Sequence, residues 1–184
     1  MEDQELESQF RHILTTLDGG RWLDDEARKN TPRRWVHMMR ELTTPTDFKF
    51  TTFAAESSDM ITLAPIPFYT MCEHHTAPFF GNVFISYVPR ESIAGLSKFP
   101  RLVNNIVKGF WTQESLTKTI ADELDHYLYP LGVGVVVRAE HLCMAMRGVR
   151  QANVITTTSA MRGVYSDHNR TAKAEFLQLV HASL

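Results

Sequence analysis

Both cysteines of this 184-residue chain have histidine neighbours. Cys72 begins a Cys-Glu-His-His run that ends at His75, and Cys143 follows a further histidine by two residues. Two thiolates and one imidazole make a zinc site of the Cys₂His kind, so Cys72, His75 and Cys143 are the predicted ligands of Zn²⁺. Because a fourth protein ligand is not evident, we expect a water molecule in the open position. Zinc lowers the pKa of such a water to about 7, and the pattern therefore predicts metal-assisted hydrolysis.

Two simpler explanations of the cysteines stay open. Buried cysteines often serve only as small apolar side chains, and a disulfide would join them in an exported protein. We expect no leader segment, and a disulfide leaves the neighbouring histidines unexplained. His74 and His141 lie beside the cysteines but are not needed for the minimal ligand set. They are therefore candidate general acids and bases.

The composition is that of a globular protein able to bury its own core, with 43% hydrophobic and 22% charged residues. No apolar run approaches the roughly 20 residues that span a bilayer, so we expect a cytoplasmic protein without membrane association. The formal net charge of -2 gives no support to nucleic-acid binding, which usually needs a basic face.

Hydrophobic periodicity predicts a helical N-terminal region, residues 1–45, followed by a main domain, residues 46–184. The expected helices are 4–18, one that begins at Thr31-Pro32, one that begins near Ser97, 113–129 and 171–181. The expected strands are 60–63 and 66–69, which prolines interrupt, and then 81–89, 133–140 and 153–164. The order in the main domain is ββααββ. Consecutive strand pairs favour an antiparallel sheet with helices packed on one face, which is an α+β fold.

Ser97, Lys98 and Arg101 form a basic cluster at the start of an expected helix. A helix N-terminus offers free N–H groups and the positive end of its dipole, and the two cationic side chains add charge, so the cluster suits a phosphate. A solvated basic turn is the alternative. Arg147, four residues after Cys143, brings another guanidinium near the metal unless it is an ordinary surface arginine.

Gln113 and Glu114 open the next expected helix. The helix dipole favours an acidic residue in a first turn, and this alone is enough to explain Glu114. The alternative is a pair of side chains that reads the edge of a nucleobase. A carboxylate can accept two N–H bonds from guanine, and an amide can complement its other groups.

Taken together, these segments resemble GTP cyclohydrolase I. The resemblance covers nearly the whole chain from Thr31 onward and rests on runs in a fixed order. They are CEHHTAPFFGNV at 72–83, AGLSKFPRLV at 94–103, TQESLTKTIADEL at 112–124, LGVGVVVRAEHLCMAMRGVR at 131–150 and TTTSAMRGVY at 156–165. One departure is the run from Gly109 to Thr112, where relatives often carry arginines, so we expect the rim of the pocket to differ in charge and bulk.

The resemblance implies a tunnelling fold, in which a four-stranded antiparallel sheet carries two helices between its strand pairs. It also implies a homo-oligomer, a decamer in bacterial members, with active sites at the interfaces between subunits. The implied reaction converts GTP and water into 7,8-dihydroneopterin triphosphate and formate. This is the first step toward folate and other pterins or toward 7-deazaguanine compounds, and no residue of the chain selects among these pathways.

The resemblance further implies a role for each candidate residue. The implied zinc ligands are Cys72, His75 and Cys143, and the water on the metal attacks C8 of guanine. The implied proton-transfer groups are His74 and His141, and the division of steps between them stays open. The implied contacts to guanine are Gln113 and Glu114. The implied contacts to the triphosphate are Ser97, Lys98, Arg101 and Arg147.

Three other functions are alternatives, and the residues argue against each of them. A zinc-stabilised binding module predicts four protein ligands and no role for His74 or His141. A related tunnelling-fold enzyme, such as a nitrile reductase, predicts a cysteine nucleophile and a nicotinamide cofactor. A zinc nucleobase deaminase predicts H-x-E and P-C-x-x-C runs, which this sequence lacks.

Overall fold

The structure is a computed structural model that describes residues 2–166 and 170–183. The chain forms two compact units, residues 1–44 and residues 45–184. Every candidate site residue belongs to the second unit. Within the described ranges, no helix is both long enough and apolar enough to cross a bilayer.

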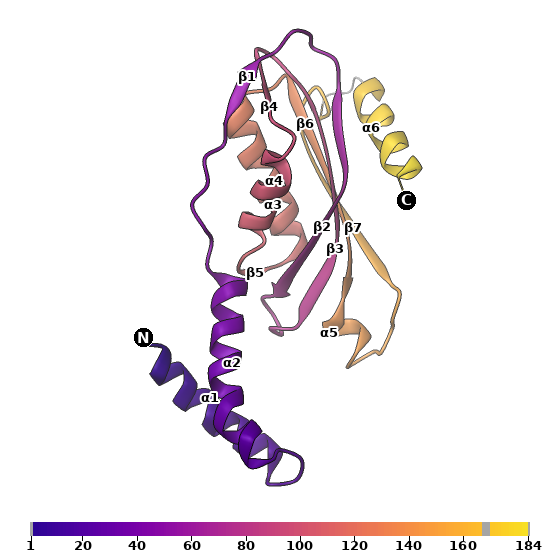
Figure 1. Ribbon diagram of the computed structural model, residues 1–184. Coiled ribbons are helices and arrows are strands. Elements are labelled where there is room, and N and C mark those ends of the chain that lie inside the picture. Colours follow the sequence, from indigo (N-terminus) through magenta and orange to yellow (C-terminus); the bar gives the residue numbers. More distant parts are fainter. Residues whose placement is uncertain (1, 167–169, 184) are drawn as a thin grey trace. The chain divides into compact units, whose positions relative to one another are not determined.

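The first unit is a pair of helices, α1 (Asp3–Asp18) and α2 (Asp25–Thr43) (Figure 1). α1 begins one residue before its predicted start and ends at the predicted residue. The rings of Phe10 and Trp35 stack with centroids 4.1 Å apart. The two rings lie on the apolar faces of α1 and α2, which helical spacing of apolar residues predicted, and they pack these faces together.

α2 begins earlier than the sequence indicated, because its cap is not the expected Thr31. The side chain of Asp24 accepts a hydrogen bond from a backbone N–H of the first turn. Pro32 therefore lies inside the helix, where it has no N–H to donate to the carbonyl of Arg28. That carbonyl instead accepts a hydrogen bond from the guanidinium of Arg11, at 2.9 Å, so the helix continues through the proline.

The second unit is built on a five-stranded sheet in the order β5-β2-β3-β6-β7. Its long strands are antiparallel neighbours: β2 (Ile61–Cys72), β3 (Pro78–Val88), β6 (Gly132–His141) and β7 (Ile155–Gly163). β5 (Phe110–Trp111) adds a short strand parallel to the end of β2. A separate small sheet pairs β1 (Thr52–Ala54) with β4 (Ser92–Ala94). The α+β class is confirmed, and the main sheet carries one short parallel strand beyond the expected antiparallel ones.

The prolines of β2 do not divide it. The segments expected at 60–63 and 66–69 form one strand, whose register with β3 shifts between Leu63 and Ile66. Pro65 lies at that shift, where the sheet ladder is already interrupted and a missing N–H costs no hydrogen bond. The sequence indicated such a bulge but not the continuity of the strand.

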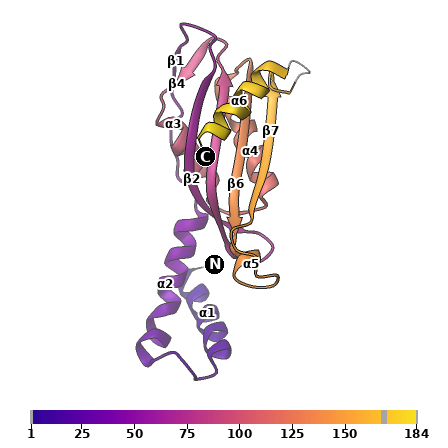
Figure 2. The same ribbon diagram turned by 90° about the vertical axis from the view of Figure 1, so that its right-hand side faces the viewer.

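Helices cover both faces of the main sheet (Figures 1 and 2). α3 (Lys98–Ile106) and α4 (Gln113–Leu128) cover one face and α6 (Arg170–Ala182) the other, and the single turn α5 (Leu142–Ala145) follows β6. Val83 and Val135 belong to the core beneath α3 and α4, whereas Phe84 and Val136 cluster with Phe176 of α6. Because alternate strand residues point to opposite faces, this second apolar set needs its own cover. The expectation of helices on one face was therefore wrong for α6.

The two ends of the main sheet carry different elements. Both views show β1 and β4 at one end and α5 at the other (Figures 1 and 2). The second end gathers the end of β2, which pairs with β5, and the start of β3, which pairs with the end of β6. The segments that contain both cysteines therefore meet there.

Candidate active site

The turn between β2 and β3 carries the Cys-Glu-His-His run. Cys72 ends β2; its backbone N–H donates to the carbonyl of Ala77, and its carbonyl accepts from the N–H of Thr76, both at 2.8 Å. Thr76 has a backbone φ angle of 50°, a left-handed conformation that closes the turn. The turn brings His75 back over the strand end, with its Nδ1 4.0 Å from Sγ of Cys72.

Cys143 reaches the same place from β6. His141 faces Phe79 across β3 and β6, and α5 follows directly. The ligand atoms of Cys72, His75 and Cys143 all lie within 4.8 Å of one another. Zinc at about 2.3 Å from sulfur and about 2.0 Å from nitrogen separates tetrahedral ligand atoms by roughly 3.5–3.8 Å. The predicted ligands therefore converge, and their distances and donor types fit zinc.

The electrostatics of the two thiols favour a cation between them. Burial raises the pKa of the Cys143 thiol, and the neighbouring Cys72 raises it further. Two thiols this close are difficult to ionise together, whereas a bound zinc ion stabilises both thiolates. Cys72 is buried, Cys143 half-buried and His75 exposed, so the group is open to solvent on the side of the histidine.

His141, at the end of β6, is held between a ring and an amide. Its imidazole stacks on Phe79 with ring centroids 4.5 Å apart and planes 6° apart. Its Nε2 lies 2.8 Å from Oε1 of Gln113. Burial lowers the pKa of His141, and the charge of Glu114 opposes that shift. Burial therefore favours the neutral imidazole, the form that can accept a proton.

Gln113 points into the protein and not toward solvent. It is the first residue of α4 and is only 2% exposed. Its Nε2 donates toward Val137, Thr156 and Thr158 on β6 and β7. The amide that we expected at a nucleobase is thus occupied by the sheet and by His141 in this chain.

Glu114 and His74 are exposed. Glu114 lies in the first turn of α4, close enough to His141 to influence its pKa. We call Cys72, His75 and Cys143 the metal group. Nε2 of His74 lies 3.6 Å from Oε1 of Glu73, on the turn that carries Cys72 and His75. Both side chains are available to a molecule that approaches this group from solvent.

The predicted basic cluster forms at the start of α3. Ser97 occupies the N-cap position, although its side chain makes no capping hydrogen bond. Nζ of Lys98 donates to the carbonyl of Lys49 at 2.9 Å, and Arg101 is exposed. The cluster is therefore on the surface, where an anion can reach it.

The length of α3 separates this cluster from the metal group. α3 has 9 residues, which at 1.5 Å per residue extend for about 14 Å. The far end of the helix lies beside the metal group, because the hydroxyl of Thr70, two residues before Cys72, donates to the carbonyl of Val107. One chain thus brings together the metal ligands, His141, Gln113 and Glu114, but not Ser97, Lys98 and Arg101. Arg147 is exposed just beyond α5, and its charge partly offsets the raised pKa of Cys143.

Sequence reasoning missed the residues that hold His141 in place. Phe79 has the pattern of an ordinary core residue, and it packs as one while also stacking on the imidazole. Thr156 and Thr158 occupy alternate positions of β7, opposite the apolar residues of β6. Polar residues on the buried face of a strand were the available signal for a hydrogen-bonding network there.

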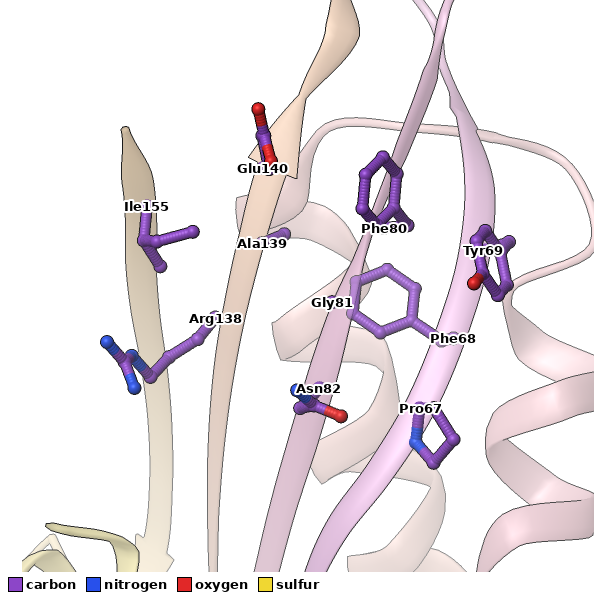
Figure 3. Close-up of a pocket in the computed structure, with 10 residues that line it drawn as sticks. All are labelled: Pro67, Phe68, Tyr69, Phe80, Gly81, Asn82, Arg138, Ala139, Glu140 and Ile155. Atoms are coloured by element: carbon purple, nitrogen blue, oxygen red, sulfur yellow. The ribbon is translucent and has the colours of Figure 1, made fainter. Parts of the chain in front are cut away.

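A separate pocket lies on the sheet face that points away from α3 and α4 (Figure 3). Its volume is about 370 Å³, and its lining includes Tyr69 of β2, Phe80 of β3, Arg138 of β6 and Ile155 of β7. The rings of Tyr69 and Phe80 stack with centroids 5.6 Å apart. The residues that line this pocket include none of the predicted site residues, so it is distinct from the metal group.

A family model and curated relatives name the same family. The family model of GTP cyclohydrolase I matches residues 6–181. GTP cyclohydrolase 1 of Hydrogenobaculum sp. (strain Y04AAS1) is 45% identical over 171 residues, which cover 91% of this chain and 93% of the relative. GTP cyclohydrolase 1 of Aquifex aeolicus (strain VF5) is 45% identical over 159 residues, which cover 85% and 86%. That of Geobacillus kaustophilus (strain HTA426) is 40% identical over 184 residues, which cover 97% and 96%. The chain therefore belongs to the GTP cyclohydrolase I family and is a hydrolase.

Proposed function

We propose that the protein is a zinc-dependent GTP cyclohydrolase I that converts GTP and water into 7,8-dihydroneopterin triphosphate and formate. The observation that carries the proposal is the convergence of Cys72, His75 and Cys143 within 4.8 Å, with His141 at the end of the same strand. The identity of the family supports the reaction, and the donor set supports the metal.

Cys72, His75 and Cys143 would hold a zinc ion, and the group is exposed to solvent at His75. Zinc bound there would lower the pKa of a water molecule to about 7 and would so supply a nucleophile for C8 of guanine. The exposed side of the group, next to His75, is where the imidazole ring of the base has access. The buried Cys72 keeps the other side free of solvent.

His141 and His74 carry the proton transfers in this proposal, from different environments. His141 is half-buried, which favours its neutral form, and it suits acceptance of a proton next to the reacting carbon. His74 is exposed beside Glu73, so it exchanges protons with bulk water between turnovers. Opening of the guanine ring and later release of formate both require proton transfer. We assign these transfers to His74 and His141.

Glu114 recognises the base. Guanine presents two adjacent N–H donors on its Watson–Crick edge, and a carboxylate accepts both. Adenine presents only one such donor there, so the same carboxylate is left partly unpaired with ATP. The exposure of Glu114 and its proximity to His141 support this role.

A second copy of the chain supplies the triphosphate contacts. Ser97, Lys98 and Arg101 lie about one helix length from the metal group of their own chain. We infer that they serve the metal group of a neighbouring subunit in a homo-oligomer, a decamer by resemblance to bacterial members. Arg147, beyond α5, completes the anion contacts from the metal side.

The proposed product serves the synthesis of folate and other pterins or of 7-deazaguanine compounds, and the proposed location is the cytoplasm. Incubation of purified, zinc-loaded protein with GTP tests the reaction. We expect formate and a product that fluoresces after oxidation, in equal amounts. Consumption of GTP without formate would exclude the reaction.

A further inference from the structure

The side chain of Gln113 is buried although it belongs to the first turn of a helix, and it is 2% exposed. Its Nε2 lies 3.1 Å from the carbonyl oxygen of Val137, 3.0 Å from that of Thr156 and 3.0 Å from Oγ1 of Thr158. Its Oε1 lies 2.8 Å from Nε2 of His141. Gln113 therefore ties α4 to β6 and β7 and contacts a candidate catalytic histidine.

These partners permit one orientation of the amide. The carbonyls of Val137 and Thr156 accept hydrogen bonds and cannot donate, so the group that faces them is the NH₂. A flipped amide would direct Oε1 at two carbonyl oxygens, with which it can form no hydrogen bond. Oε1 therefore faces His141, and an amide oxygen can only accept. The hydrogen between the two groups belongs to Nε2 of His141.

We propose that Gln113 is a positioning residue that fixes His141 as the Nε2–H tautomer and leaves Nδ1 with the free lone pair. The inference rests on the proposed function and changes the role of Gln113 within it, because the resemblance implied a contact with guanine. Phe79 fixes the plane of the imidazole by stacking, and Gln113 fixes the edge that faces the sheet. Proton exchange with the substrate then occurs at Nδ1.

A direct contact between Gln113 and the base would require its side chain to leave the sheet. That movement would break its hydrogen bonds with the carbonyls of Val137 and Thr156 and with the Nε2–H of His141. Glu114, the next residue, is exposed and reads the base without any such loss. Gln113 therefore holds His141, and Glu114 binds the substrate.

Gln113→Met tests the proposal, because methionine has a similar length but forms no comparable hydrogen bonds. We expect kcat to fall on the order of 10²-fold, while KM for GTP stays within about threefold and the preference for GTP over ATP is unchanged. In a His141→Ala background, Gln113→Met should add no further fall in kcat, since both residues act on one step. Ser86→Ala is the control, because it removes a buried hydrogen bond to Tyr165, at 2.8 Å, on the α6 side of the sheet. This control should retain kcat.

A second measurement uses the unaltered chain and does not depend on the folding of any variant. In zinc-loaded protein labelled with ¹⁵N-histidine, the signals of His141 are identified by their loss in His141→Ala. We expect a proton on Nε2 and none on Nδ1. A proton on Nδ1, additive losses in the double variant, or a raised KM with loss of the preference for GTP would each overturn the inference. Absence of formate release by the unaltered protein would instead reject the proposed function, and the tautomer measurement is independent of it.

Discussion

Two variants that are inactive alone are expected to restore activity when they assemble into one oligomer. In the first, Lys98→Ala and Arg101→Ala remove the basic cluster, and in the second, His141→Ala removes a proton-transfer group. The cluster and the metal group lie at opposite ends of α3, about 14 Å apart along its axis. If a neighbouring copy supplies the cluster, a mixed oligomer contains sites that combine the intact half of each variant.

The size of the effect follows from the number of complete sites. In a random equal mixture, half of the sites keep His141 and half face an intact basic cluster, so about one quarter of the sites are complete. We therefore expect about one quarter of the specific activity of the unaltered protein. The two variants are co-expressed with different tags and purified through both, and formate release is measured at a GTP concentration below KM.

Each variant alone, purified in the same way, is the control for residual activity, and its zinc content and size show whether it assembles. Activity of the mixture no higher than the mean of these controls would refute the shared site. It would mean that Lys98 and Arg101 do not act on the metal group of another copy.

The remaining predictions concern single residues. Replacing Cys72 or Cys143 by Ser should remove the metal and nearly all turnover, because a hydroxyl is a poor zinc ligand; full zinc occupancy in either variant, found by metal analysis, would contradict the ligand assignment. Glu114→Ala should reduce the preference for GTP over ATP, by up to about 10⁴-fold, whereas a role in the helix dipole costs only about 0.3–1 kcal/mol of stability and leaves the preference intact. Competition kinetics with both nucleotides, together with thermal melts of that variant, distinguish these two outcomes. Asp18→Asn tests whether the charge of Asp18 stabilises the helix pair of the first unit. A hydrogen bond from the backbone N–H of Trp22 is the main cause that lowers the pKa of Asp18, and burial opposes that shift. The pKa of the Asp18 carboxyl is lower in the folded than in the unfolded protein. The ionised carboxylate therefore stabilises the fold fully above the unfolded pKa of about 3.9, and this stabilisation is lost as the pH falls through the folded pKa. The difference in melting temperature between the two proteins should therefore be largest near neutral pH and shrink in acid, and a difference independent of pH would show that the charge of Asp18 has no role.

The elements that carry the site could be predicted because their patterns are local. Apolar spacing over 113–129 predicted a helix, and α4 is Gln113–Leu128 with Thr112 as its cap. The ligand group was also predictable, since the chain has only two cysteines and each lies near a histidine. Because the chain has no other cysteine, few other combinations of soft ligands could form a zinc site.

The direction of the Gln113 side chain could not be predicted in the same way. It depends on the register of β6 and β7, which pairs Val137 with Thr158 and places two carbonyls and a hydroxyl beneath the first turn of α4. Pairing between strands that are distant in sequence leaves no periodic pattern next to the glutamine itself. Local spacing therefore found the residue but not its partner.

The start of α2 shows the same limit. A proline preceded by threonine is a good local signal for a first turn, and it was misleading here. The carbonyl that Pro32 leaves without a donor is satisfied by Arg11, from the other helix of the pair. Only the tertiary contact explains why the helix passes through the proline.

The most direct test of the central claim follows one carbon atom of the substrate. GTP labelled with ¹³C at C8 is incubated with zinc-loaded protein, with protein stripped of metal by a chelator, and with stripped protein to which zinc has been returned. The account predicts labelled formate in equal amount to the pterin product in the first and third samples and none in the second, with the fold retained throughout. Unlabelled formate, or labelled formate released at an undiminished rate without metal, would contradict it.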